Sequence, residues 1–175
     1  MDHNLTLYLS QGEIADAVRR LAGELDQEYY RSDPVLVGVM KGAFIFLADL
    51  VRQMKTPLGR VELVHVSSYG PGRTTSGRAR MVKSTPRESI QGQHVVLVED
   101  IVDTGITTST VLKHLCRYRP ASVEVCVLLD KPARRQVEVN PRFVGFTIPD
   151  RFVVGYGLDL DQRYRQLPDI YTVDE

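Results

Sequence analysis

The sequence has no tryptophan, only two cysteines and no excess of charge of either sign. Lys plus Arg and Asp plus Glu number 22 each, so no overall electrostatic field would draw the protein toward nucleic acid or an anionic membrane. The four histidines are too scattered for the ligand spacing of a zinc site; they are His3, His65, His94 and His114. Any charged ligand must therefore be bound by local groups.

Long apolar runs are also missing. No stretch reaches the length of a membrane-spanning helix, and the first twenty residues lack the basic start and the apolar block of a signal peptide. Cys116 falls in a helical pattern and Cys126 in an apolar, strand-like run, so we expect two small buried side chains rather than a disulfide. These features favour the reducing cytoplasm, and 175 residues with 43% apolar side chains suffice for one domain over residues 1–175.

The spacing of apolar residues predicts an α/β protein. Ser10 and Glu13 form a capping-box pattern, and apolar residues then recur every three or four positions, which predicts a helix over 11–29. Apolar, β-branched runs predict strands over 35–40, 61–66, 94–98 and 123–129, with helices following Lys41-Gly42 and over 107–118. Such continuous apolar strands are buried on both faces, so the fold class is an open, mainly parallel sheet flanked by helices. In such sheets ligands bind beyond the carboxyl ends of the strands.

Residues 67–83 are poor in apolar side chains and rich in glycine, serine and threonine. This composition predicts a mobile surface loop.

The clearest functional pattern lies at residues 95–108, where an apolar strand is followed by Glu99, Asp100 and Asp103 and then by a turn containing Gly105. The N–H groups that open a helix hold phosphate, and Thr104, Thr107 and Thr108 offer further donors. Adjacent carboxylates accept hydrogen bonds from neutral sugar hydroxyls. The pattern therefore indicates a site for a ribose 5-phosphate, although the same residues could merely cap an ordinary helix.

This pattern resembles the phosphoribosyl pyrophosphate motif of the type I phosphoribosyltransferases. From Leu36 to Tyr171 the chain is similar, in several segments in the same order, to the hypoxanthine-guanine phosphoribosyltransferase family. The matching segments are Lys41-Gly42 (the pyrophosphate loop), Ser68-Tyr69 (the lid), Asp130-Lys131 (the base-recognition strand end) and 152–159 (the purine and metal segment). The resemblance implies the type I fold, with a small hood from the N- and C-terminal segments and a mobile lid over the site.

The resemblance also implies how the leaving pyrophosphate is held. Lys41 and Gly42, preceded by a cis peptide bond, would bind it together with Arg165, and Asp159 would bind Mg²⁺. Glu99 and Asp100 would contact the ribose hydroxyls or the metal. Taken alone, Lys41 would be an ordinary exposed lysine, and Asp159 with Arg165 a surface ion pair.

At the base end, the resemblance implies that Lys131 donates to a purine 6-oxo group, which would select hypoxanthine or guanine over adenine. Phe152 would stack on the purine, Val153 would offer a backbone carbonyl, and Asp103 would act as general base at purine N7. Ile106 stands where many family members carry a lysine or arginine. The 5-phosphate should then rest on backbone N–H groups and threonine hydroxyls.

The expected activity is therefore purine salvage with phosphoribosyl pyrophosphate and Mg²⁺, in a homodimer or homotetramer that has no nucleic-acid or membrane partner. One alternative is a regulator of the same fold that senses phosphoribosyl pyrophosphate, and another is a transferase that prefers xanthine or guanine. A nucleotide hydrolase with a P-loop is excluded because the glycine-lysine-serine/threonine pattern is absent.

Overall fold

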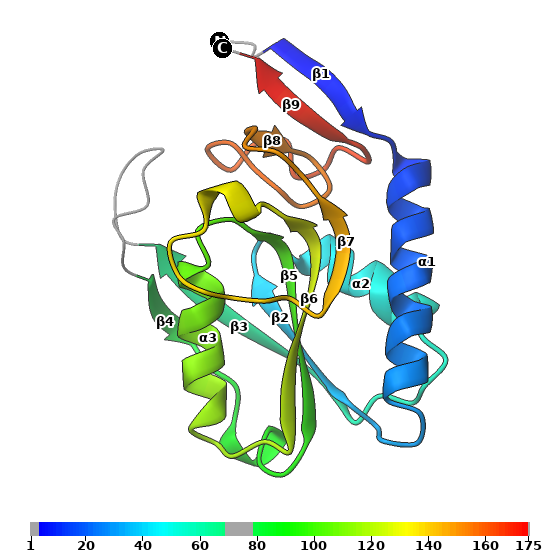
Figure 1. Cartoon of the computed structure of the whole chain (residues 1–175), viewed down its shortest axis with the longest axis vertical. Helices are drawn as coiled ribbons and strands as arrows, with labels where there is room; N and C mark the ends of the chain where they lie inside the picture. Colours follow the sequence, from blue (N-terminus) through cyan, green and yellow to red (C-terminus); the bar gives the residue numbers. More distant parts are fainter. Residues whose placement is uncertain (1–3, 69–78, 175) are drawn as a thin grey trace.

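The computed structural model describes residues 4–68 and 79–174, which form a central sheet, a smaller second sheet and three α-helices (Figure 1). The central sheet has the strand order β4-β3-β2-β5-β6-β7, and the second has the order β1-β9-β8. The strands are β1 (Asn4–Leu9), β2 (Val35–Met40), β3 (Arg60–Ser68), β4 (Ala79–Lys83), β5 (His94–Val102), β6 (Ser122–Asp130), β7 (Phe143–Thr147), β8 (Val153–Val154) and β9 (Ile170–Asp174). The helices are α1 (Gln11–Glu28), α2 (Phe44–Gln53) and α3 (Ile106–Cys116).

The central sheet confirms the predicted open α/β class. Its strands pair in parallel except for β4, which runs antiparallel to β3. The helix α1 begins at the predicted capping box, in which the Ser10 hydroxyl accepts from the Glu13 N–H and the Glu13 side chain accepts from the Ser10 N–H. Because β2, β5 and β6 run parallel, their carboxyl ends lie along one edge of the sheet.

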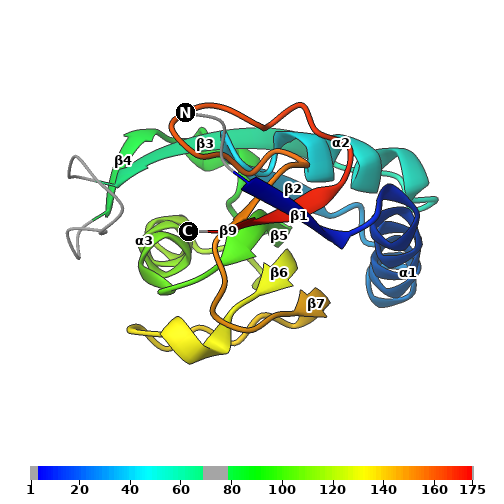
Figure 2. The same ribbon diagram turned by 90° about the horizontal axis from the view of Figure 1, so that it is seen from above.

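Alternate residues of the strands contribute their side chains to two separate cores, one on each face of the sheet. Leu36, Val96 and Leu128 pack with buried side chains of α1 and α2, whereas Val37 and Leu97 face the opposite way and pack with side chains of α3. The view from above shows α1 and α2 on one side of the sheet and α3 on the other (Figure 2). Burial on both faces explains why the strands read as nearly continuous apolar runs.

The second sheet joins the two ends of the chain above the central sheet (Figures 1 and 2). The strand β9 pairs antiparallel with β1 on one side and with β8 on the other. This is the hood expected from the N- and C-terminal segments. It covers the edge at which the parallel strands end, so a ligand bound there would lie between the two sheets.

Three local predictions were wrong. Residues 67–83 are not all loop, because their ends belong to β3 and to β4, which pair with each other. The strand β5 does not end before Glu99 but continues to Val102, because its apolar residues 101 and 102 keep pairing with β6. Cys116 is exposed at the end of α3, and only Cys126 is buried; both are free.

Within the described residues, no helix combines the length and the apolar character that a membrane span requires.

Candidate active site

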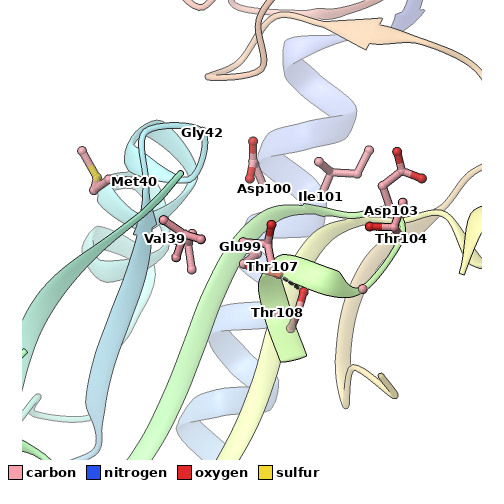
Figure 3. Close-up of a pocket in the computed structure, with 12 residues that line it drawn as sticks. Val39, Met40, Gly42, Glu99, Asp100, Ile101, Asp103, Thr104, Thr107 and Thr108 are labelled. Carbon is pink, nitrogen blue, oxygen red and sulfur yellow. Dashed lines mark hydrogen bonds between the residues drawn. The ribbon is translucent and has the colours of Figure 1, made fainter. Parts of the chain in front are cut away.

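Two adjoining pockets, of about 790 Å³ and about 210 Å³, lie at the carboxyl ends of β2 and β5. The larger extends to β6 and to the residues of β8 and the loop that follows it. Met40, Gly42, Asp100, Ile101 and Asp103 line both pockets, so they form one cleft with a narrow and a wide part. The side chains of Asp100 and Ile101 on β5 and of Asp103 in the turn after it point the same way in Figure 3.

The narrow part of the cleft contains the phosphate-binding pattern found in the sequence. Gly105 precedes α3 with a φ of 81°, a left-handed conformation that favours glycine. A Cβ atom at this position would lie 2.5 Å from the carbonyl oxygen of Val137, so the turn is also closely packed from behind. The Thr104 carbonyl accepts hydrogen bonds from the N–H groups of Gln136 and Val137. The Ile106 N–H donates to Thr104 Oγ1 at 3.4 Å, and Ile106 itself lines neither pocket. Gly105 and Thr107 line the narrow pocket, so the first turn of α3, whose N–H groups have no partner within the helix, borders the cleft.

Glu99 forms the buried floor beneath this turn. Its carboxyl group accepts a hydrogen bond from the Thr108 hydroxyl (Figure 3). Thr108 was expected to donate to a phosphate, but its hydroxyl hydrogen is used by Glu99 instead. Burial raises the pKa of Glu99 to about 8, and the neighbouring Asp100 carboxylate contributes to the increase. At neutral pH Glu99 therefore tends to keep its proton.

Asp100 connects the two parts of the cleft. Burial raises its pKa to about 6, while backbone hydrogen bonds and the positive charge of Arg165 lower it. Its carboxylate also lies against the backbone of Gly42, because a Cβ atom built on Gly42 would be 1.8 Å from Asp100 Oδ2. Only glycine permits this approach, so β5 and the turn after β2 meet at one point.

At the wide end, Lys131 lies at the carboxyl end of β6 and is 3% exposed, so it is not the surface lysine that a polar strand end often carries. Its Nζ atom is 4.0 Å from Asp103 Oδ2 and 3.5 Å from Asp150 Oδ1. Arg134 lies beside the same two acids, with Nε 3.5 Å from Asp103 Oδ1 and Nη1 3.8 Å from Asp150 Oδ1. Two cations and two carboxylates thus alternate around this end of the cleft.

The Asp103 carboxylate lies beside the cations of the wide part. Its Oδ1 atom is buried, has no hydrogen-bond partner among the described residues and is 3.5 Å from Arg134 Nε. The side chain as a whole is 34% exposed and lines both pockets, so a bound ligand can reach it. A carboxylate in this position can accept a hydrogen bond from a ligand, as a general base must.

Phe152 and Val153 also line the wide part. Phe152 is 43% exposed, so its side chain is accessible to an aromatic ligand. Val153 is buried and belongs to β8, where it is held by pairing with β9. The hood sheet thus supplies one wall for a flat ligand.

A third group of polar residues lines the wide part of the cleft. Arg165 and Asp159 form an ion pair with an N–O distance of 2.7 Å, as their local sequence alone suggested. The Gln162 side-chain oxygen accepts hydrogen bonds from Lys41 Nζ at 3.3 Å and Arg165 Nη2 at 3.4 Å. The peptide bond between Met40 and Lys41 is cis, as the resemblance implied. Two cations and one acid therefore meet around Gln162.

The cleft thus brings together nearly all of the site residues that the sequence indicated. Ser68 is the last residue of β3, and Tyr69 lies outside the described residues. Arg134, Asp150 and Gln162 were missed. Asp150 follows β7, a strand that was not predicted; with β7 recognised, the rule that ligand groups follow strand ends would have indicated Asp150.

No group of three or more His, Cys, Asp or Glu side chains within residues 4–68 and 79–174 would hold a metal ion by itself. Asp100 and Asp159 nevertheless line the same pocket with oxygen ligands. Mg²⁺ commonly uses one or two carboxylates, several waters and the oxygens of a bound phosphate. The donor set therefore fits a Mg²⁺ ion that arrives with a phosphorylated ligand.

Comparisons with known proteins agree with this geometry. The profile of the phosphoribosyl transferase domain matches residues 5–161. The hypoxanthine-guanine phosphoribosyltransferase of Aquifex aeolicus is 45% identical over 172 residues, which cover 98% of this chain and 96% of that protein. The hypoxanthine phosphoribosyltransferase of Salmonella typhimurium is 43% identical over 175 residues, which cover 99% and 97%. A crystal structure of a hypoxanthine-guanine phosphoribosyltransferase from Bacillus anthracis is similar with a TM-score of 0.90 and 35% identity, covering 99% of this chain and 100% of that one.

Proposed function

Because this chain belongs to the phosphoribosyl transferase family, we propose that it is a purine-salvage enzyme acting on hypoxanthine or guanine. It transfers the 5-phosphoribosyl group of phosphoribosyl pyrophosphate to the base and releases pyrophosphate. The observation that carries the proposal is the cleft, in which a phosphate-binding turn, a base-side cation and a pyrophosphate-side pair of cations all line one connected space. Each chemical part of the two substrates then has a matching group.

The 5-phosphate binds at the turn formed by Thr104, Gly105, Ile106 and Thr107. Backbone N–H groups and the helix dipole of α3 favour an anion there, and Ile106 adds no charge. The ribose lies over Asp100 and Ile101, where carboxylate oxygens accept hydrogen bonds from its hydroxyls. Glu99 is protonated and hydrogen-bonded to Thr108, so it lies beneath Asp100 without adding a second negative charge.

The purine lies at the wide end against the Phe152 ring. The Lys131 ammonium donates to the 6-oxo group of hypoxanthine or guanine, while the 6-amino group of adenine would present a donor to a donor. An unpaired buried donor costs about 1–3 kcal/mol, which is a discrimination of roughly tenfold to a hundredfold. Val153 offers its carbonyl to the edge of the base.

Asp103 accepts the proton of purine N7 as N9 attacks C1 of the ribose and the bond from C1 to pyrophosphate breaks. Lys131 and Arg134 flank the Asp103 carboxylate, so they keep it directed toward the purine rather than toward solvent. On the far side of the ribose, Lys41 and Arg165 stabilise the negative charge that grows on the pyrophosphate. Asp159 and Asp100 would hold Mg²⁺, which supplies further charge neutralisation for the leaving group.

We further propose a homodimer or homotetramer in the cytoplasm. Free cysteines, one of them exposed, suit a reducing compartment.

The test is consumption of hypoxanthine, guanine, xanthine and adenine by the purified chain with phosphoribosyl pyrophosphate and Mg²⁺. We expect turnover of hypoxanthine or guanine, little of adenine, and a loss of kcat on the order of a hundredfold or more in Asp103→Asn, which removes the proton acceptor. Binding of phosphoribosyl pyrophosphate without turnover of any base would show instead that the chain is a regulator.

A further inference from the structure

We propose that Gln162 occupies the pyrophosphate position in the substrate-free enzyme and sets the affinity of that position by competing with the substrate. The inference rests on the proposed function, because it concerns the Lys41 and Arg165 cations assigned above to pyrophosphate. Gln162 lines the cleft but was indicated by no motif in the sequence.

The Gln162 amide donates from Nε2 to Asp159 Oδ2 at 3.4 Å, but its oxygen occupies the place of an anion. Its Oε1 atom accepts from both Lys41 Nζ and Arg165 Nη2, so it lies where an oxygen atom bridges the two cations. A bridging pyrophosphate oxygen would use the same position. At 3.3 and 3.4 Å these hydrogen bonds are long, and an amide oxygen carries no full charge, so a pyrophosphate oxygen can displace it.

The backbone holds Gln162 in this place independently of the cations. Leu160 and Arg163 exchange backbone hydrogen bonds across a tight turn whose two central residues, Asp161 and Gln162, have φ values of 51° and 67°. The Gln162 N–H also donates to Asp159 Oδ2 at 2.8 Å. The turn therefore keeps its shape when the side chain leaves the cations. Only the side chain must move to admit the substrate, and the movement also breaks its 3.4 Å hydrogen bond to Asp159.

A side chain that must leave before the substrate binds weakens the apparent affinity of the site. Removing the bridging oxygen should therefore tighten pyrophosphate binding. The opposite result is expected for a residue that binds substrate directly, since losing its hydrogen bonds weakens binding. The direction of the change thus separates the two roles.

The test uses Gln162→Ala and Gln162→Asn. Gln162→Ala removes the side-chain amide. Gln162→Asn keeps an amide, but its side chain is one methylene shorter and cannot bridge the two cations, and asparagine tolerates the left-handed conformation of the turn. Gln166→Ala is the matched control, because this exposed glutamine is outside the cleft lining. We expect both Gln162 variants to lower the KM of phosphoribosyl pyrophosphate on the order of threefold to tenfold, and Gln166→Ala to leave kcat and both KM values unchanged.

Calorimetric titration with pyrophosphate and Mg²⁺ should show the same gain in affinity for both variants and none for Gln166→Ala. A higher KM and weaker pyrophosphate binding would show that Gln162 binds the substrate, and unchanged values would show that it does not compete; either result overturns the proposal. A wild-type chain without turnover would refute the proposed function, while the titration would still decide the role of Gln162.

Discussion

The close approach of the Gly42 backbone to Asp100 gives the sharpest prediction about the cleft. In Gly42→Ala the new Cβ atom would lie 1.8 Å from Asp100 Oδ2 and 2.4 Å from its Cγ, far inside the 3.4 Å at which ordinary contact begins. The turn or the carboxylate must therefore move by roughly 1.5 Å before the clash is relieved. Both groups belong to the site, since Gly42 adjoins Lys41 and Asp100 lines both pockets.

Overpacking of this kind destabilises a protein by about 1–3 kcal/mol. A displacement of about 1 Å at a reacting centre lowers the rate on the order of a hundredfold. We therefore expect Gly42→Ala to lose kcat/KM for phosphoribosyl pyrophosphate by about that factor while remaining folded. Initial rates at varied phosphoribosyl pyrophosphate, together with urea unfolding, measure both effects.

Gly23→Ala provides the control within the same chain. Gly23 lies inside α1, and a Cβ atom there would meet nothing within 4 Å. Alanine should stabilise the helix by about 0.5–1 kcal/mol and leave the rate unchanged. If Gly42→Ala had wild-type kcat/KM, the contact between the turn after β2 and β5 would not be needed for activity, and the argument from close packing would be refuted.

Two further predictions concern buried charge. In Lys131→Met we expect kcat/KM for hypoxanthine to fall roughly tenfold to a hundredfold, and the preference for hypoxanthine over adenine to shrink, because the 6-oxo group loses its donor. The control Lys113→Met, at an exposed position of α3, should change neither kcat/KM nor the base preference. An unchanged base preference in Lys131→Met would refute the role of Lys131. The pKa of Glu99, raised from 4.5 to about 8 in the folded chain, means that the folded state holds a proton that the unfolded state releases. This contribution to stability is complete below pH 4.5 and is lost as pH rises through about 8, by up to about 1.4 kcal/mol per pH unit. Glu99→Gln is neutral throughout, so in urea unfolding without ligand it should gain stability relative to the wild type from about pH 5 to about pH 8. A stability difference that stays constant over this range would contradict a raised pKa.

Much of the central fold could be predicted from the sequence because it depends on residues that are close together in the chain. The period of the apolar residues predicted α1, β2 and β6 within one residue at each end, since burial on both faces of a parallel sheet requires continuous apolar strands. The turn from Asp103 to Thr107 was recognisable because a glycine, three acids and adjacent threonines lie together in the sequence.

The tertiary structure decided what depends on partners distant in the chain. The strand β5 extends past Glu99 because β6 continues beside it, and β4 forms because β3 offers an edge. Lys131 is buried because Asp103 and Asp150, from two other segments, neutralise it. Gln162 meets Lys41 across 121 residues of sequence. Sequence periodicity reports which side of an element is buried, whereas the partner of a polar side chain is set by how separate elements pack. That is why Arg134, Asp150 and Gln162 were recognised only in three dimensions.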